Sequence, residues 1–141
     1  MMKKTYNLLV INVGSTSTKV GWFTGRNHAV IETIRYSSEA LASYKSISDQ
    51  LPRREEDILK FLAGNGISLE MIDMIVSRGG LGKPAPAGAY MIDDNMCRDL
   101  LEGKYGMHPS ALGPAMAFHI AKKYGIRAIV IDPPSTDEFQ P

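Results

Sequence analysis

Short apolar runs separated by polar turns occupy the first third of the chain and predict three strands. The runs cover residues 5–12, 18–24 and 28–36, and they are rich in Val, Ile, Leu and Thr. Runs of this length and composition are typical of strands. Gly-Arg-Asn at 25–27 suits a hairpin turn. The chain therefore begins with an antiparallel meander of three strands.

After this meander the apolar period changes to that of a helix. Residues 50–63 place Leu51, Ile58, Leu59 and Leu62 on one face, with charged residues elsewhere, as in an amphipathic helix. A strand over 71–77 follows, with a possible short strand at 89–93. Helices are predicted over 93–103 and 109–124, and the last strand over 125–132.

The order β-β-β-α-β-α-β predicts an α/β domain with a mixed five-stranded sheet and helices on both faces. Because the last strand directly follows a helix, it should lie parallel to the strand at 71–77 through a right-handed crossover. With 141 residues, the chain is long enough for one domain with a substantial core. We expect residues 1–141 to form a single domain.

Composition and charge exclude several classes of function. The formal net charge of +1 argues against a broad nucleic-acid or anionic-membrane surface. No segment approaches the roughly 18 apolar residues of a membrane span, so no membrane partner is expected. Cys97 is the sole cysteine, which suits a reducing cytoplasm, and a lone cysteine among helix-like residues is usually structural.

The turn between the first two strands gathers hydrogen-bond donors. It contains GSTSTK at 14–19, and its backbone N–H groups, hydroxyls and lysine ammonium suit an anion. It is not a Walker A loop, because a strand and not a helix follows the lysine. A plain polar turn explains the same residues, since Ser and Thr are common in turns. The candidate phosphate- or nucleotide-binding residues are Asn12, Gly14, Ser15, Thr16, Ser17 and Lys19.

Two later strand ends carry further candidates. Arg78 is followed by Gly79 and Gly80, which permit a close approach of the backbone to a ligand. Asp132 follows the last strand, at the edge of the sheet where ligands gather in α/β folds. Structural alternatives stay open, because Arg78 also fits a surface arginine and Asp132 a turn cap before Pro133.

Three segments in order resemble the acetate and butyrate kinases of the actin and sugar-kinase superfamily. They are LLVINVGSTSTKVGWF at 8–23, VSRGGLGKPAPAGAYMID at 76–93, and MHPSALGPAMAFHIAKKYGIRAIVIDPPSTDEF at 107–139. Ile75 and Arg78 stand where acetate kinases have the Arg and the second His of H-R-V-V-H-G-G, so the chain looks like the butyrate branch. Ala111 departs from that branch, which has Asn there.

The resemblance implies a ribonuclease H-like or actin-like half-domain and the transfer of the ATP γ-phosphoryl group to butyrate or a related short or branched acid. It implies ATP and Mg²⁺ as cofactors, a small carboxylate as substrate, and a homo-oligomer when full length. The implied catalytic residues are Lys19, Arg78 and Asp132; the implied substrate-binding residues are Arg78, Gly79, Gly80 and His108; the implied metal ligands are Asn12 and Asp132.

Family members work with two domains, so we expect this chain to be an N-terminal domain that lacks the second, nucleotide-binding domain and turns over no ATP alone. Two alternatives stay open. One is a non-catalytic half-domain that binds an anion or forms a dimer. The other is a kinase for acetate or propionate.

Overall fold

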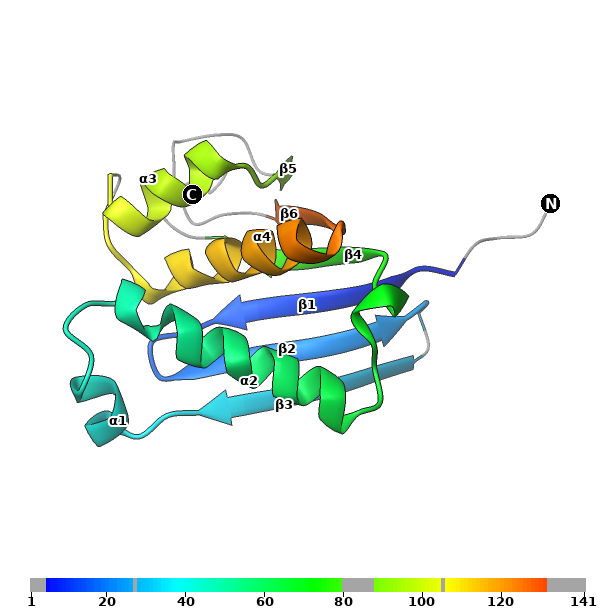
Figure 1. Ribbon diagram of the computed structural model, residues 1–141, viewed down its shortest axis with the longest axis horizontal. Helices are drawn as coiled ribbons and strands as arrows, with labels where there is room; N and C mark the ends of the chain where they lie inside the picture. The colour runs from blue at the N-terminus through cyan, green and yellow to red at the C-terminus, as the bar shows by residue number, and fades with distance from the viewer. Residues whose placement is uncertain (1–4, 27, 80–87, 105, 132–141) are drawn as a thin grey trace, which may run out of the picture.

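The computed structural model describes residues 5–26, 28–79, 88–104 and 106–131. Figure 1 shows the arrangement of its strands and helices. In chain order the elements are β1 (Asn7–Val13), β2 (Ser17–Thr24), β3 (His28–Arg35), α1 (Ser38–Ala42), η1 (Ser48–Gln50), α2 (Leu51–Gly64), η2 (Leu69–Met71), β4 (Met74–Arg78), β5 (Ala89–Met91), α3 (Asp94–Glu102), η3 (Pro109–Ala111), α4 (Leu112–Tyr124) and β6 (Arg127–Ile131).

The strands form one mixed sheet in the order β3-β2-β1-β4-β6-β5. β1 is antiparallel to β2, and β4 is parallel to β6, as the sequence predicts. The structure adds that β1 is parallel to β4. The predicted α/β class is confirmed, but the sheet has six strands and not five. The sixth is β5, whose three residues pair antiparallel with β6 at the edge of the sheet. So short a run gives little periodicity to recognise.

Local signals in the sequence set the bounds of the helices. Pro52 lies in the first turn of α2, where its missing N–H leaves no helical bond unmade. After α2, Gly66 adopts a φ of 67°, and the Ile67 N–H donates to the Leu62 carbonyl at 2.9 Å. This left-handed glycine closes the helix at the predicted place.

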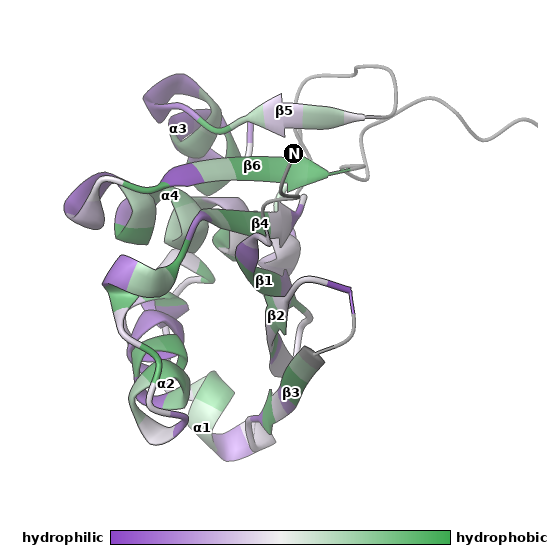
Figure 2. Ribbon diagram, turned by 90° about the vertical axis from the view of Figure 1, so that its right-hand side faces the viewer, coloured by the Kyte–Doolittle hydropathy of each residue, from purple (hydrophilic) through white to green (hydrophobic). Residues whose placement is uncertain are grey.

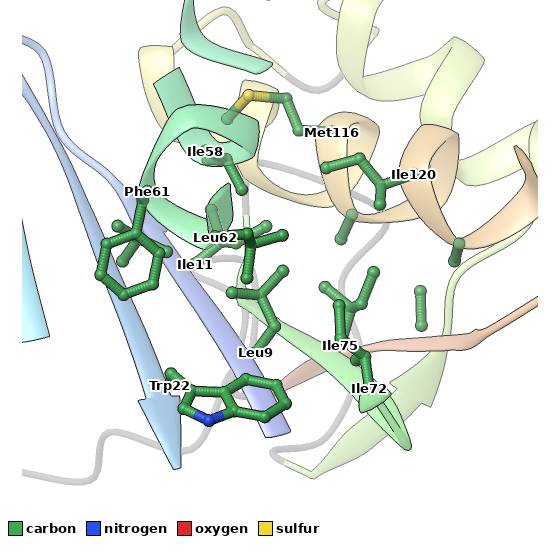
Figure 3. Close-up of a cluster of buried hydrophobic side chains, with 14 of the residues drawn as sticks. Leu9, Ile11, Trp22, Ile58, Phe61, Leu62, Ile72, Ile75, Met116 and Ile120 are labelled. Atoms are coloured by element: carbon green, nitrogen blue, oxygen red, sulfur yellow. The ribbon is translucent and has the colours of Figure 1, made fainter. Parts of the chain in front are cut away.

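The helices α2 and α4 enclose the core. α2 and α4 lie on the same face of the sheet, and α3 lies beside α4 (Figures 1 and 2). The cluster in Figure 3 joins both helices to the strands through Leu9, Ile11, Trp22, Ile58, Phe61, Leu62, Ile72, Ile75, Met116 and Ile120.

The alternation along β1 fixes which side chains face the core. Leu9, Ile11 and Val13 are buried beneath the helices, whereas Asn12 between them is exposed. Because successive strand side chains point to opposite faces, Asn12 lies on the face away from α2 and α4. The candidate residue Asn12 therefore lies on the opposite face of the sheet from the core residues Ile11 and Val13 that flank it.

Candidate functional site

The structure brings Asn12, Lys19 and Arg78 together in one groove. Asn12 on β1 is the register partner of Lys19 on β2. On the other side of β1, Ile11 pairs with Ser77 of β4, so Arg78 is the next residue along beside Asn12. The groove has a volume of about 230 Å³ and is lined by Val10, Asn12, Lys19, Gly21, Phe23, Ile31 and Arg78. An amide and two cations therefore share one surface of the sheet.

A glycine shapes the apolar part of this groove. A Cβ at Gly21 would lie 2.7 Å from Cε2 of Phe23 and 3.6 Å from Cγ1 of Ile31. Real Cβ atoms do not approach a carbon so closely. The absence of a side chain at Gly21 therefore leaves room for the Phe23 ring to lie over the backbone of the same strand. The groove therefore has polar lining from Asn12, Lys19 and Arg78 and apolar lining from Val10, Phe23 and Ile31.

The carbonyl groups of the turn between β1 and β2 accept hydrogen bonds from other parts of the chain. The Gly14 N–H donates to the Ser17 carbonyl at 2.9 Å, and the Tyr36 N–H donates to the Thr16 carbonyl at 2.9 Å. The carbonyls of Gly14, Ser15 and Ser17 accept hydrogen bonds from the guanidinium of Arg54 at 2.9, 3.0 and 2.8 Å. All four carbonyls from Gly14 to Ser17 are thereby satisfied.

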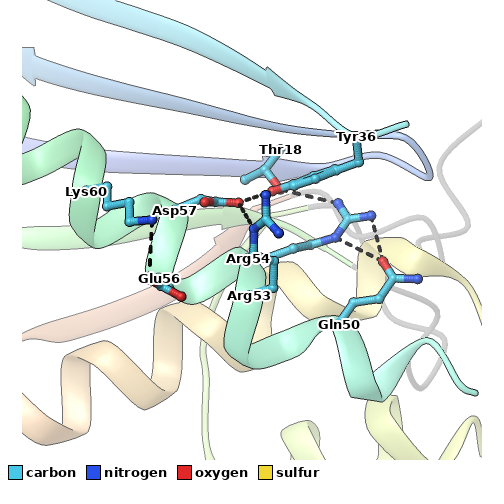
Figure 4. A network of polar contacts seen from close by, with 8 residues as sticks. All are labelled: Thr18, Tyr36, Gln50, Arg53, Arg54, Glu56, Asp57 and Lys60. Carbon is cyan, nitrogen blue, oxygen red and sulfur yellow. Dashed lines mark hydrogen bonds and ion pairs between the residues drawn. The ribbon is translucent and has the colours of Figure 1, made fainter. Parts of the chain in front are cut away.

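Arg54 comes from α2 and is only 1% exposed (Figure 4). It also donates to Oε1 of Gln50 from Nε (3.1 Å) and Nη2 (2.9 Å), and from Nη1 to Oγ1 of Thr18 at 3.3 Å. Among the described residues, no carboxylate forms an ion pair with it. Burial lowers the pKa of the Arg54 guanidinium, but arginine starts so high that it stays charged.

A tyrosine and an aspartate extend this network. The guanidinium carbon of Arg54 lies 4.7 Å from the centre of the Tyr36 ring, a cation–π distance. The Tyr36 hydroxyl donates to Oδ2 of Asp57 at 2.9 Å and lies 3.0 Å from Oγ1 of Thr18. Burial is the main cause that raises the pKa of Tyr36. The exposed Arg53 pairs with the same Asp57 oxygen at 3.3 Å.

Arg54 belongs to none of the motifs that stand out in the sequence. Its position carries a usable signal, since Arg54 is three residues after Leu51 and four before Ile58, on the apolar stripe of the helix. A charged residue in such a stripe is buried with partners or breaks the pattern. The partners of Arg54 in the turn are backbone carbonyls, which cannot be recognised from a pattern of side chains in the sequence.

Arg78 and Gly79 lie where β4 ends. The Arg78 side chain is on the exposed face, and Gly79 is buried. Oγ of Ser77 donates to the Arg78 carbonyl at 2.7 Å, and Gly113 of α4 packs directly on that hydroxyl. The start of α4 therefore supports the backbone of Arg78 from the core side.

Part of the predicted site lies outside the described residues. Gly80 and Asp132 are both in this category, so the predicted metal pair is described only at Asn12. Within the part of the chain that the structure describes, no group of three or more His, Cys, Asp or Glu side chains is placed to hold a metal ion.

His108 has a structural contact of its own. Its Nδ1 accepts a hydrogen bond from the Ser110 N–H at 3.0 Å and lies 2.8 Å from Oγ of Ser110. The ring thus caps η3, which leads into α4. Its predicted contact with substrate stays a prediction.

The chain matches no protein-family model. It is 41% identical over 135 residues to butyrate kinase 2 of Clostridium acetobutylicum, which covers 96% of this chain. The chain is homologous to the N-terminal part of butyrate kinase. This confirms the resemblance found in the sequence. The homologous segment spans 38% of the length of that relative.

Solved structures with a similar fold include two acetate kinases. Acetate kinase from Entamoeba histolytica matches with a TM-score of 0.53 and 23% identity, over 89% of this chain and 34% of that one. Acetate kinase from Porphyromonas gingivalis matches with a TM-score of 0.50 and 15% identity, over 89% of this chain and 37% of that one.

Within the described ranges, no helix combines the length and apolar character needed to cross a bilayer.

Proposed function

We propose that the complete protein containing this chain transfers the γ-phosphoryl group of ATP to a short-chain carboxylate of the butyrate class. The observation that carries the proposal is the 41% identity to butyrate kinase along 96% of the chain. The groove supports it, because Asn12, Lys19 and Arg78 meet beside a turn rich in N–H donors. We assign the adenosine site to a second domain outside these 141 residues and expect the complete protein to be a homo-oligomer.

The chemistry explains why cations suit this site and why no general base is needed. A carboxylate is already ionised at neutral pH, so its oxygen attacks the γ-phosphorus directly. A carboxylate-oxygen–phosphorus bond forms while the bond from phosphorus to the β,γ-bridging oxygen breaks, and the electron pair leaves with ADP. The obstacle is the repulsion between two anions and the charge on the transferring oxygens. Lys19 and Arg78 are placed to offset both.

Roles follow from what each group offers. The ammonium of Lys19 and the hydroxyls and N–H groups of the 14–17 turn suit the phosphoryl oxygens. The planar guanidinium of Arg78 suits the substrate carboxylate. Asn12 offers an amide oxygen to a magnesium ion, and Asp132 would complete that site; bound Mg²⁺ neutralises phosphate charge. Gly79, Gly80 and His108 remain substrate-binding candidates.

A hydroxamate assay on the complete gene product tests the proposal. ATP is supplied with acetate, propionate, butyrate or isobutyrate, and acyl phosphate is trapped with hydroxylamine. We expect trapped product to be most abundant with butyrate or isobutyrate. A maximum at acetate or propionate would assign the other carboxylate-kinase activity, and no acyl phosphate from any acid would overturn the proposal in favour of a non-catalytic anion-binding module.

A further inference from the structure

The turn between β1 and β2 is held by a charged group on the face opposite to the groove. Arg54 reaches it from α2, beneath the sheet, whereas Lys19 and Arg78 lie on the exposed face. All three guanidinium nitrogens are used, and three of their acceptors are main-chain carbonyls of the turn. A planar fork with five N–H donors fixes those carbonyls in direction as well as in distance.

Fixing the carbonyls also fixes the N–H groups. In a trans peptide unit the C=O and the N–H point in opposite directions. The Gly14 carbonyl points at Arg54, so the Ser15 N–H points away from it, and the Ser15 carbonyl sets the Thr16 N–H in the same way. Among the residues that the structure describes, no acceptor takes a hydrogen bond from the N–H of Ser15 or Thr16. Two donors are thus left for a ligand.

The charge of Arg54 acts in the same sense as its hydrogen bonds. The guanidinium is 1% exposed and forms no ion pair with the described carboxylates; carbonyl and amide dipoles contact it directly, and the Asp57 carboxylate of the same network acts on it through space. Fields from a buried charge are screened far less than those from an exposed one. The positive charge of Arg54 beneath the turn favours an anion above it.

We propose that Arg54 is a positioning residue for the phosphate-binding turn: it holds the N–H groups of Ser15 and Thr16 toward a tetrahedral oxyanion and biases that place electrostatically. This inference rests on the proposed function for the identity of the anion, a nucleotide phosphoryl group. Arg54 itself touches no substrate and acts through the backbone of the turn. Gln50 aligns the guanidinium by accepting from two of its nitrogens.

Arg54→Lys in the complete protein tests the proposal, because lysine keeps the charge but has one nitrogen where arginine has a fork. Small displacements in a site cost up to about 100-fold in rate. We expect kcat/KM for acyl phosphate formation to fall about 100-fold, chiefly through kcat, with the carboxylate KM within about twofold of wild type. Phe61→Leu is the matched control, since Phe61 is buried on the same helix seven residues beyond Arg54. It should lower the Tm and leave kcat/KM unchanged.

A second readout needs no turnover. With selective ¹⁵N labelling of serine and threonine, inorganic phosphate should shift the amide signals of Ser15 and Thr16 in the wild-type protein and not in Arg54→Lys. Equal amide responses and equal kcat/KM in both proteins would overturn the inference. It would also be overturned if phosphate did not shift the Ser15 and Thr16 amide signals of the wild-type protein. If Arg54→Lys does not fold, Gln50→Ala decides. It should lose about tenfold in kcat/KM, and full activity contradicts the proposal.

The two proposals fail in different ways. If the wild-type protein forms no acyl phosphate but phosphate shifts its Ser15 and Thr16 amides in an Arg54-dependent manner, the positioning role stands and the kinase assignment falls. If the wild-type protein is an active kinase and Arg54→Lys matches it in both measurements, the kinase assignment stands and the positioning role falls.

Discussion

Lys19 and Arg78 reach the groove from strands on either side of β1, so each presents its charge from a different direction. We expect Lys19→Ala and Arg78→Ala, in the complete protein, each to lower kcat/KM about 10²–10³-fold, as removal of one stabilising donor does in other enzymes. The hydroxamate assay with ATP and butyrate measures the loss.

The control for these substitutions is Lys60→Ala. Lys60 is an exposed lysine of α2 that forms a surface ion pair with Glu56 at 3.3 Å. Such pairs contribute little, so activity should be unchanged. Near-wild-type rates in either groove variant would remove that residue from its assigned role.

The lone thiol behaves in the opposite way to a reactive cysteine. Burial, followed by the nearby carboxylates of Asp94 and Asp93, raises the pKa of Cys97 to about 12. The thiolate is the nucleophile. At pH 8 we therefore expect Cys97 to react with a disulfide reagent roughly a hundredfold or more slowly than a free thiol. In 6 M guanidinium chloride the same chain should react at the ordinary rate, and fast labelling of the folded chain would contradict the assignment.

At the scale of elements, the packing of α4 on β4 depends on one missing methyl group. A Cβ at Gly113 would lie 2.5 Å from Oγ of Ser77 and 3.2 Å from the carbonyl oxygen of Arg78. We expect Gly113→Ala to lower the free energy of unfolding by about 1–3 kcal/mol, because overpacking forces a shift in one of these groups. Urea unfolding measures this as a lower midpoint.

Two comparisons isolate the contact. In a Ser77→Ala background the clashing hydroxyl is absent, so Gly113→Ala should cost clearly less. At Gly64, near the end of α2, an added Cβ meets nothing within 4 Å, and Gly64→Ala should be neutral or slightly stabilising. An equal loss of stability with serine or alanine at position 77 would refute the packing explanation.

Hydrophobic period and turn residues were sufficient to predict most elements. The meander, the helices and the parallel β4–β6 pair follow from runs and punctuation that are local in sequence. The sequence predicts only a possible strand at 89–93 and a sheet without it, because the three residues of β5 carry almost no period. The contacts of Arg54 could not be predicted in this way, since its partners are carbonyls 37 to 40 residues earlier in the chain.

The same distinction applies to the candidate site. The residue types of the turn and of Arg78 indicate anion chemistry, and sequence is enough to select them. That Asn12, Lys19 and Arg78 line one groove depends on strand register, which only the folded sheet displays. Register is fixed by the buried alternation of β1 against its neighbours, a property of the packed core.

At the scale of the whole molecule, stability against alkali reports on the network under the sheet. The Tyr36 hydroxyl is hydrogen-bonded to Asp57, and burial raises its pKa above the ordinary value of 10.0. Its contribution to stability is therefore complete below about pH 10, the unfolded value, and is lost as the pH rises through the higher folded value. We expect the free energy of unfolding to decline above pH 10, and Tyr36→Phe to show a shallower decline.

Urea titrations followed by circular dichroism between pH 8 and 11 provide the measurement. Tyr6→Phe serves as control, because Tyr6 is an exposed tyrosine before the first strand. Parallel pH profiles for the wild-type protein and Tyr36→Phe would show that the alkaline loss arises elsewhere.

The attachment of the 14–17 turn to α2 also affects the order in which parts of the chain fold during synthesis. Hairpins form within microseconds, so β1 and β2 can pair as soon as they leave the ribosome. Arg54 is synthesised 37 to 40 residues after the carbonyls that it holds. At 5–20 residues per second that interval is about 2 to 8 s. During those seconds the nascent hairpin lacks the contacts that order its turn, and on the proposed role of Arg54 it becomes able to hold a phosphate only when the helix docks.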